Sequence, residues 1–374
     1  MSAQHLPNRV LLTTDAVGGV WVYAMELALI LSQLTVEVVL VVLGPRVSSA
    51  QAAEAAALPG VMLAETGLPL DWMAASREVL DRTAAALAVL AREYEVELIQ
   101  LHSPAWAASC PWPAPVIAVT HSCVGTWWRA VRGDGPLPAD FAWRIAAVRA
   151  GLLAADAVIA PTQAFAGLTR QVYGLHRPIQ VVHNARSATT LAFGFRAGVL
   201  AAGRLWDEAK NIATLDAAAA MLPGVPVAAA GPLRGPHGAA VSLAAITALG
   251  ALDARSMAAA MASARIFASP SVYEPFGLAV LEAAQAGLPL VLADIPTFRE
   301  LWEGAAMFLP PTAPAAWSEA LRRLHERPLE CQERGERARK RAARYGIGQF
   351  TASMCDHYRR ALIGPRWRHE RVAL

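Results

Sequence analysis

Cysteine is scarce in this sequence of 374 residues, which contains only four. None of them lies in a CxxC pair or at metal-finger spacing from histidine. Isolated cysteines of this kind are typical of reduced thiols in a cytosolic protein, so we expect a cytoplasmic location. The four positions are Cys110, Cys123, Cys331 and Cys355.

Targeting and membrane-spanning patterns are also missing. The first residues show no basic region followed by a clean apolar stretch, so we expect no signal peptide. The most apolar region, residues 20–43, is interrupted by Glu26, Gln33 and Glu37, whereas a spanning helix needs ~20 nearly uncharged residues. We expect a soluble chain, and peripheral contact with the inner face of a membrane stays open.

The sequence has little charge, with 17% charged residues and a formal net charge of +3. The Arg-rich stretches 334–344 and 359–368 account for most of this excess. A nucleic-acid-binding protein usually has a concentrated basic face with stacking or base-reading groups, and no such motif is found. We therefore expect no nucleic-acid partner, while a weak attraction to an anionic membrane or substrate stays open.

Motifs of several enzyme classes are absent. There is no GxSxG, HExxH, GxxxxGK[ST] or DxD-type acidic cluster. This excludes the common signatures of serine hydrolases, zinc proteases and P-loop nucleotidases. We expect neither a bound metal nor a cofactor.

Short apolar runs alternate with helical patterns along the chain, whose residues are 55% hydrophobic. The runs lack polar alternation, which is typical of parallel strands buried on both faces. Six runs, an irregular segment at 183–197 and six further runs predict two doubly wound α/β domains. The first six are 10–13, 36–43, 97–101, 116–120, 157–160 and 179–182; the second six are 198–202, 225–230, 246–249, 265–268, 289–293 and 306–309. Predicted helices in the first half span 20–34, 71–94, 140–155 and 162–173, and 330–362 reads as two helices broken at Gly346.

Two paired glycines, Gly18 and Gly19, lie between the first predicted strand and its helix. Glycine allows close approach of a ligand to the backbone, and a helix N-terminus attracts anions. The spacing is not GxGxxG, so a plain strand–helix turn is an equal alternative.

A second loop pairs Gly203 and Arg204 with Lys210 and Asn211, after the first strand of the second domain. Open α/β sheets bind ligands at the carboxyl ends of their strands, and two cations there suit a diphosphate. The alternative is a solvated pair of charges at the start of a helix.

The most informative pattern contains two glutamates, Glu274 and Glu282, separated by seven residues. Pro275 and Gly277 predict a loop that ends near Leu278, where a helix begins. The glutamates would lie ~12 Å or more apart, which suits the two ends of a nucleotide sugar. Free N–H groups near Phe276, Gly277 and Leu278 could meet phosphates between them. Two solvated glutamates are the alternative, which an apolar neighbourhood disfavours.

His121 ends a predicted strand of the first domain, close to Trp127 and Trp128. Its position at a strand end favours a role in lining the site over a buried structural role. The tryptophans alone are more typical of packing than of a sugar platform.

Taken in order, these motifs resemble the retaining glycosyltransferase family 4, a large family of the GT-B fold. The resemblance covers nearly the whole chain and is strongest over 198–309. It implies two Rossmann-like doubly wound parallel-sheet domains facing across a cleft. We divide the chain into an acceptor-side domain at 1–188, a nucleotide-sugar-binding domain at 189–345, and a C-terminal helix at 346–374 that crosses back to the first domain.

The resemblance also implies roles for individual residues. Arg204 and Lys210 would neutralise the donor diphosphate. Glu282 would hold the ribose hydroxyls, and Glu274 would contact the transferred sugar. His121 would contact that sugar from the first domain. The remaining donor-binding positions would be Gly18, Gly19, Gly203, Asn211, Gly250, Ala251, Leu252, Phe276, Gly277 and Leu278.

Two segments depart from the family pattern. The interdomain junction, often P-N-G-[IV]-D, reads Val182-His183-Asn184-Ala185-Arg186, and a common glycine pair is replaced by the segment 295–300. These departures leave the donor and acceptor undefined.

The function expected is metal-independent transfer of a hexose, with retention, from a nucleotide-diphosphate sugar to a saccharide, lipid-linked or small-molecule acceptor, as in polysaccharide biosynthesis. A sugar-nucleotide epimerase or a phosphorylase of the same fold is one alternative. A catalytically silent nucleotide-sugar-binding scaffold is another, from a different class.

Overall fold

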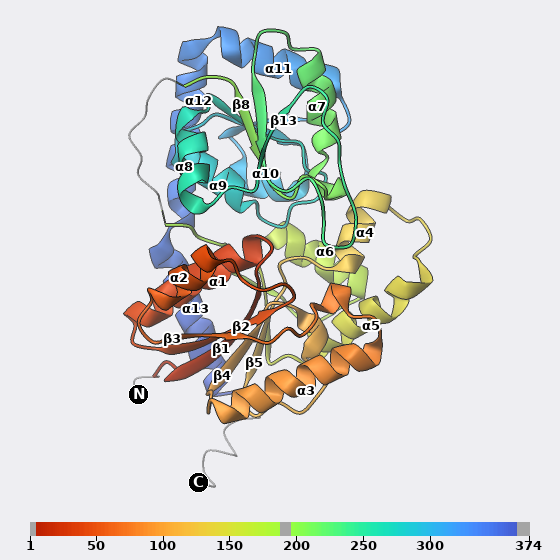
Figure 1. Ribbon diagram of the computed structural model, residues 1–374, viewed down its shortest axis with the longest axis vertical. Coiled ribbons are helices and arrows are strands. Elements are labelled where there is room, and N and C mark those ends of the chain that lie inside the picture. The colour runs from red at the N-terminus through yellow and green to blue at the C-terminus, as the bar shows by residue number, and fades with distance from the viewer. Residues whose placement is uncertain (1–4, 188–195, 365–374) are drawn as a thin grey trace. The chain divides into compact units, whose positions relative to one another are not determined.

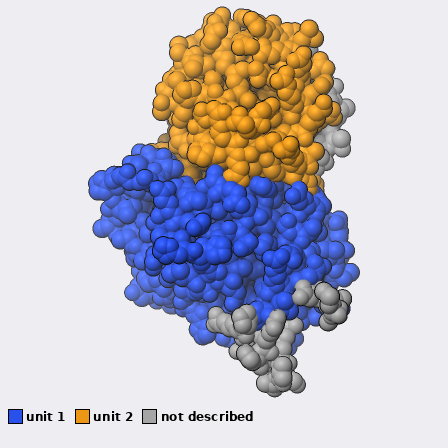
Figure 2. Space-filling model, turned by 180° about the vertical axis from the view of Figure 1, so that it is seen from behind, with its two compact units in different colours: residues 1–185, 347–374 blue, residues 186–346 orange. Residues whose placement is uncertain are grey.

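The computed structural model describes residues 5–187 and 196–364 (Figure 1). The chain divides into two compact units (Figure 2). Unit 1 contains residues 1–185 and 347–374, and unit 2 contains residues 186–346. Residues 188–195 of the irregular segment at 183–197 lie outside the described residues, as do residues 365–374.

Unit 1 is built on a parallel sheet of seven strands in the order β3-β2-β1-β4-β5-β6-β7. Its strands are β1 (Arg9–Asp15), β2 (Glu37–Leu43), β3 (Val61–Glu65), β4 (Leu98–Leu101), β5 (Val116–Val119), β6 (Ala157–Ala160) and β7 (Gln180–Val181). Its helices are α1 (Gly19–Gln33), α2 (Ser49–Ala56), α3 (Arg77–Glu93), α4 (Val124–Arg132), α5 (Ala139–Ala154), α6 (Gln163–Tyr173) and α13 (Ile347–Leu362), with 3-10 turns at η1 (Asp71–Met73) and η2 (Pro104–Trp106).

Unit 2 repeats this plan with six parallel strands in the order β10-β9-β8-β11-β12-β13. Its strands are β8 (Val199–Ala202), β9 (Val227–Ala230), β10 (Thr247–Gly250), β11 (Ile266–Ser269), β12 (Leu290–Ala293) and β13 (Ala306–Leu309). Its helices are α7 (Ile212–Ala220), α8 (Ala254–Ser263), α9 (Leu278–Gln285), α10 (Pro296–Trp302), α11 (Pro314–Glu326) and α12 (Pro328–Ala342), with 3-10 turns at η3 (Glu208–Lys210) and η4 (Ala343–Tyr345).

The two doubly wound parallel sheets confirm the predicted fold class. The prediction of six strands in the first half was wrong, because β3 is a seventh. This edge strand contains four successive apolar residues, 61–64, so its short run was present in the sequence and was overlooked, although the strand is only partly buried. Two short helices, α2 and α4, were also missed, and the predicted helix at 71–94 is interrupted between η1 and α3.

The last helix, α13, joins the core of unit 1 although it follows unit 2 in the chain. Phe350, Met354 and Tyr358 pack with residues of α1 and β4. The Tyr358 hydroxyl donates to Gln100 Oε1 at 2.8 Å, which fastens α13 to β4. Within residues 5–187 and 196–364, none of the helices combines the length and apolar character needed to cross a bilayer.

Candidate functional site

The strand order of unit 2 reverses direction between β8 and β11, which are hydrogen-bonded neighbours. In open α/β sheets, ligands bind outside the carboxyl ends of the strands at such a switch point. The loops that follow these two strands are joined there: Val272 N donates to Ala209 O at 2.9 Å, and Asn211 Nδ2 donates to Pro270 O at 3.0 Å. The structure therefore brings together the two loops that the sequence analysis singled out in this domain.

Lys210 and Glu274 form an ion pair between these loops, through Lys210 Nζ and Glu274 Oε2. Their side chains are only 17% and 16% exposed. Partly buried charges are tolerated when each has an opposite partner, whereas an isolated one would be costly. The pair therefore places one cation and one carboxylate side by side at the switch point.

Arg204 follows β8 and is 40% exposed. Its Nη2 lies 2.9 Å from Asp207 Oδ2, and its guanidinium carbon lies 5.6 Å from the centre of the Trp206 ring. Asp207 also accepts from Ala209 N at 3.0 Å, so it fixes both the cation and the turn η3. Neither Asp207 nor Trp206 was singled out from the sequence. Both lie between Arg204 and Lys210, and an acidic residue between two cations could have indicated Asp207 as their partner.

Asn211 has a left-handed backbone, with φ of 51°. Its Nδ2 donates to the carbonyls of Pro270, at 3.0 Å, and Pro311, at 2.7 Å. Its Oδ1 accepts from the Thr214 hydroxyl at 3.0 Å. The Asn211 side chain thus links its own loop to the loops that contain Pro270 and Pro311. This structural role was not predicted from the sequence, which indicated only donor binding.

Gly203 and Gly231 lie side by side at the ends of β8 and β9. A Cβ on Gly231, whose φ is 138°, would lie 1.7 Å from the Gly203 carbonyl oxygen. Gly231 also donates from its N to Gly250 O at 2.7 Å, which links this edge to β10. Of the predicted donor-binding residues, Gly250 therefore ends the exposed edge strand β10 at the same carboxyl edge, and Ala251 and Leu252 follow it.

Helix α9 begins at Leu278, as predicted. Gly277 precedes it with φ of 88°, and a Cβ there would lie 3.3 Å from Glu274 Cγ. Phe276 is buried with its ring edge-on to Tyr345 at 5.8 Å between centres. The first N–H groups of an α-helix have no partner within the helix, so the start of α9 offers donors beside Glu274.

Glu282 lies one turn into α9 and is paired with Arg186. Arg186 Nε donates to Glu282 Oε1 at 2.7 Å, and Gln285 Nε2 donates to Arg186 O at 2.8 Å. From the sequence, Arg186 was identified only as part of a departure from the family's junction pattern. Its pairing depends on how the junction approaches α9, which no local pattern encodes.

In unit 1 the strand order reverses between β1 and β4. Gly18 and Gly19 lie after β1, at the N-terminus of α1. Gly18 has an extended backbone with φ of −172°, and Asp15 Oδ1 accepts from Val17 N at 2.8 Å. The structure thus places the glycine pair at the predicted turn, but Gly18 is not in a conformation restricted to glycine.

His121 follows β5 and is half-buried, with its Nε2 enclosed and without a hydrogen-bond partner among the described residues. Burial lowers the pKa of His121 to about 4. Its ring lies edge-on to Tyr23, with 4.5 Å between centres. A neutral imidazole can give or accept a hydrogen bond without carrying charge.

A second histidine, His102, was missed by the sequence analysis. Its ring centre lies 5.1 Å from that of His121, and its Nε2 is 2.8 Å from Gln100 Nε2. Burial, with a smaller contribution from His121, holds the pKa of His102 well below its usual range. The available signal was a polar pair, Gln100 and His102, at the carboxyl end of an otherwise apolar run.

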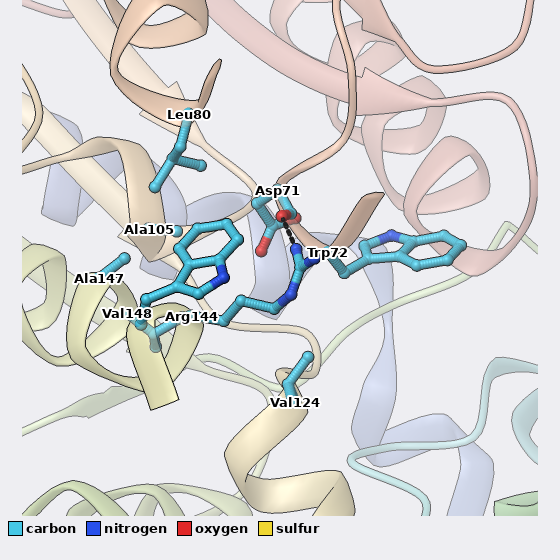
Figure 3. A pocket seen from close by; sticks show the side chains of 9 residues that line it. Asp71, Trp72, Leu80, Ala105, Val124, Arg144, Ala147 and Val148 are labelled. Carbon is cyan, nitrogen blue, oxygen red and sulfur yellow. Dashed lines mark hydrogen bonds between the residues drawn. The ribbon is translucent and has the colours of Figure 1, made fainter. Parts of the chain in front are cut away.

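Near Trp72, unit 1 also encloses a small cavity lined by side chains of α3, α4 and α5 (Figure 3). Arg144 Nη1 donates to the Asp71 carbonyl at 3.1 Å, and burial raises the pKa of the Asp71 carboxyl. The cavity measures about 10 Å³, enough for roughly one water molecule. It is therefore too small for a sugar. The part of the chain that the structure describes contains no group of three or more His, Cys, Asp or Glu residues able to hold a metal ion.

Comparison with known proteins identifies both halves of the chain. Residues 17–188 match the model of Glycosyltransferase Family 4, and residues 196–327 match that of Glycosyl transferases group 1. A D-inositol 3-phosphate glycosyltransferase of Kineococcus radiotolerans is 33% identical over 110 residues, 27% of this chain and 25% of that protein. The D-rhamnosyltransferase WbpZ of Pseudomonas aeruginosa is 31% identical over 125 residues, 31% of this chain and 33% of that protein. The chain thus spans only a quarter to a third of these curated relatives.

Solved structures share the fold over almost the whole chain. A sucrose-phosphate synthase of Thermosynechococcus elongatus has a TM-score of 0.78 at 18% identity, covering 94% of this chain and 98% of its own. HepE of Anabaena, in complex with UDP and glucose, has a TM-score of 0.70 at 16% identity, covering 94% and 99%. The fold is thus that of the GT-B glycosyltransferases. Two glycosyltransferase domains, one of family 4 type and one of group 1 type, therefore make up most of the chain.

Proposed function

We propose that the protein transfers a hexose, with retention and without a metal ion, from a nucleotide-diphosphate sugar to a sugar or lipid-linked acceptor. One observation carries the proposal: at the switch point of the second sheet, the loop after β8 carries the cations Arg204 and Lys210, and Lys210 is paired with Glu274 from the loop after β11. The domain that holds them matches a glycosyltransferase model, and HepE, which shares the fold, was solved with UDP and glucose.

In this proposal the diphosphate binds to the Arg204 and Lys210 side chains and to N–H groups at the start of α9. Lys210 is already paired with Glu274, so the phosphate would bind to the Lys210 ammonium while that ammonium keeps its contact with Glu274. Fixed donors of this kind stabilise charge that develops on a leaving group, which is often the largest contribution to catalysis. Side-chain cations take the place of a metal ion.

The proposed reaction breaks the bond between the anomeric carbon and the diphosphate oxygen and forms one to an acceptor oxygen. The acceptor proton passes to the departing phosphate on the same face of the sugar, so no protein nucleophile is required. Glu274 would stabilise the positive charge that develops on the sugar ring. Because the His121 imidazole is neutral, we assign it a hydrogen bond to a sugar hydroxyl.

A panel of UDP-, GDP- and ADP-linked hexoses, each with and without candidate acceptors, tests the proposal. Release of nucleoside diphosphate that depends on the acceptor is the expected result. Turnover only with inorganic phosphate would identify a phosphorylase, and conversion of the donor alone into its epimer would identify an epimerase. Binding of a donor without any turnover would indicate a silent scaffold.

A further inference from the structure

An arginine that the proposed chemistry does not use lies where the chain enters unit 2. Arg186 is the first residue of that unit. Its Nε donates to Glu282 Oε1 at 2.7 Å, and its carbonyl accepts from Gln285 Nε2 at 2.8 Å. Glu282 and Gln285 are three residues apart on α9 and so share a face of that helix. Arg186 is therefore attached to α9 at two points, one through its side chain and one through its main chain.

The side-chain contact is shielded but still accessible. Arg186 and Glu282 are 20% and 22% exposed, so a ligand can reach the carboxylate. A charged hydrogen bond from a guanidinium defines direction as well as distance. Among the described residues no donor is placed on Glu282 Oε2, and Oε1 has a second lone pair. The carboxylate is therefore fixed in orientation while it keeps acceptor sites for a ligand.

The geometry points to Arg186 as a positioning residue that holds the Glu282 carboxylate ready for the vicinal hydroxyls of the donor ribose. This inference rests on the proposed function, in which Glu282 binds ribose. A free glutamate side chain loses rotamer freedom when it is immobilised by a ligand. Arg186 has already restricted Glu282 before the donor arrives, so donor binding becomes more favourable.

A purely structural explanation is that Arg186 only attaches the incoming chain to α9. Gln285 separates the two explanations, because its side chain supports the Arg186 main chain and is not hydrogen-bonded to the Glu282 carboxylate. Gln285→Met removes the main-chain attachment alone. Arg186→Gln removes the charged contact with Glu282 and leaves the carbonyl that Gln285 binds.

The experiment measures donor KM and kcat at saturating acceptor for Arg186→Gln, Arg186→Lys, Gln285→Met, Glu282→Gln and the double variant Arg186→Gln/Glu282→Gln. Binding of UDP, GDP and ADP is measured in parallel by calorimetry. We expect Arg186→Gln to raise donor KM ~5–10-fold with kcat changed less than about twofold, the mark of lost uniform binding. Arg186→Lys should recover part of this loss. Gln285→Met should lower the melting temperature but leave donor KM unchanged.

In the Glu282→Gln background, Arg186→Gln should add no further rise in KM, because coupled residues are not additive. Equal KM shifts in Arg186→Gln and Gln285→Met, additive effects in the double variant, or a lower KM in Arg186→Gln would each overturn the inference. If the wild-type protein turns over no donor, the proposed function fails, yet calorimetry with the diphosphate it binds still tests Arg186. Wild-type protein that binds none of the three diphosphates would overturn both.

Discussion

The carboxyl edges of the two sheets use opposite chemistry. In unit 2 this edge carries ion pairs, Lys210 with Glu274 and Arg186 with Glu282. In unit 1 it carries the neutral rings of His102 and His121, whose pKa values burial depresses. The same sheet architecture thus supplies fixed charges in one domain and uncharged hydrogen-bonding groups in the other.

The difference follows from what surrounds each group. Each charge in the two unit 2 pairs has an opposite partner within reach, which offsets much of the cost of burying it. The histidine rings of unit 1 lie beside aromatic rings and the Gln100 amide, and their burial favours the neutral form. A diphosphate needs the first kind of surface, and sugar hydroxyls are suited to the second.

The largest effect should come from removing a cation of unit 2. Arg204→Ala should lower kcat/KM ~10²–10³-fold, by analogy with the loss of one preorganised donor. Its unfolding free energy should also fall modestly, because Asp207, whose side chain is only 6% exposed, loses this charged partner. Lys210→Ala should cost similar activity and also destabilise the fold, since Glu274 loses its partner. Steady-state kinetics and denaturation measure both effects.

Arg323→Ala is the matched control, because Arg323 is paired with Glu330 on the helices α11 and α12, away from the loops after β8 and β11. It should keep wild-type kinetics. Wild-type turnover in Arg204→Ala and Lys210→Ala would rule out the role of unit 2 as a diphosphate site.

The two glutamates of unit 2 should respond differently. Glu274→Gln should lower kcat ~10–100-fold, because a carboxylate beside the sugar stabilises charge only as it develops. Glu282→Gln should mainly raise donor KM, because ribose is unchanged during transfer. Kinetics with the donor varied at saturating acceptor distinguish the two. Swapped phenotypes would reverse the orientation assigned to the donor, and wild-type values in both would end the paired-glutamate interpretation.

The neutral edge of unit 1 predicts a pH dependence of stability. The pKa of His121 falls from an unfolded value of about 6.5 to about 4 on folding. Between pH ~6.5 and pH ~4 the unfolded chain binds a proton at His121 more readily than the folded chain does. The stabilisation that comes from the neutral His121 is therefore complete above pH ~6.5 and is lost as the pH falls toward ~4. His121 should therefore account for about 1–2 kcal/mol of unfolding free energy lost between pH 6.5 and pH 5.

Chemical denaturation of wild type and His121→Gln at these two pH values measures the effect, because the carboxylates common to both proteins cancel in the difference. Equal losses in the two proteins would show that His121 is protonated as readily in the folded chain as in the unfolded one. The contrast between a charged and a neutral edge would then fail on the unit 1 side.

The smallest effect should be that of chelation. If Arg204 and Lys210 supply the positive charge, EDTA should leave the transfer rate within about twofold of its untreated value. Loss of activity that added magnesium or manganese restores would contradict the metal-independent part of the proposal. A parallel assay with a known metal-dependent transferase shows that chelation was effective.

The fold could be predicted from the sequence wherever local patterns decide it. The strands of unit 2 are short apolar runs, and Pro275 and Gly277 mark the loop before α9, so each was placed correctly. The half-exposed strand β3 has a similar run, residues 61–64, which was overlooked. The exposed edge strand β10 was predicted from its run, so exposure at a sheet edge does not by itself hide a strand.

The candidate site was predictable only in part. Residue types after strands indicated Arg204, Lys210 and His121, and the spacing of two glutamates indicated Glu274. The structure places each at a carboxyl edge of its own sheet. The partners of these residues could not be predicted. Arg186 meets Glu282 only because residues far apart in sequence converge on α9. A sequence pattern identifies the chemistry of a side chain, but tertiary packing determines which charges are paired before a ligand arrives.

The central claim, that the charged edge of unit 2 recognises a diphosphate, is tested most directly by calorimetry. Wild type and Arg204→Ala are titrated with UDP, GDP and ADP and with the matching nucleosides uridine, guanosine and adenosine. We predict that wild type binds one nucleoside diphosphate far more tightly than its nucleoside, and that Arg204→Ala loses most of this preference. An unchanged preference for the diphosphate in Arg204→Ala would contradict the claim.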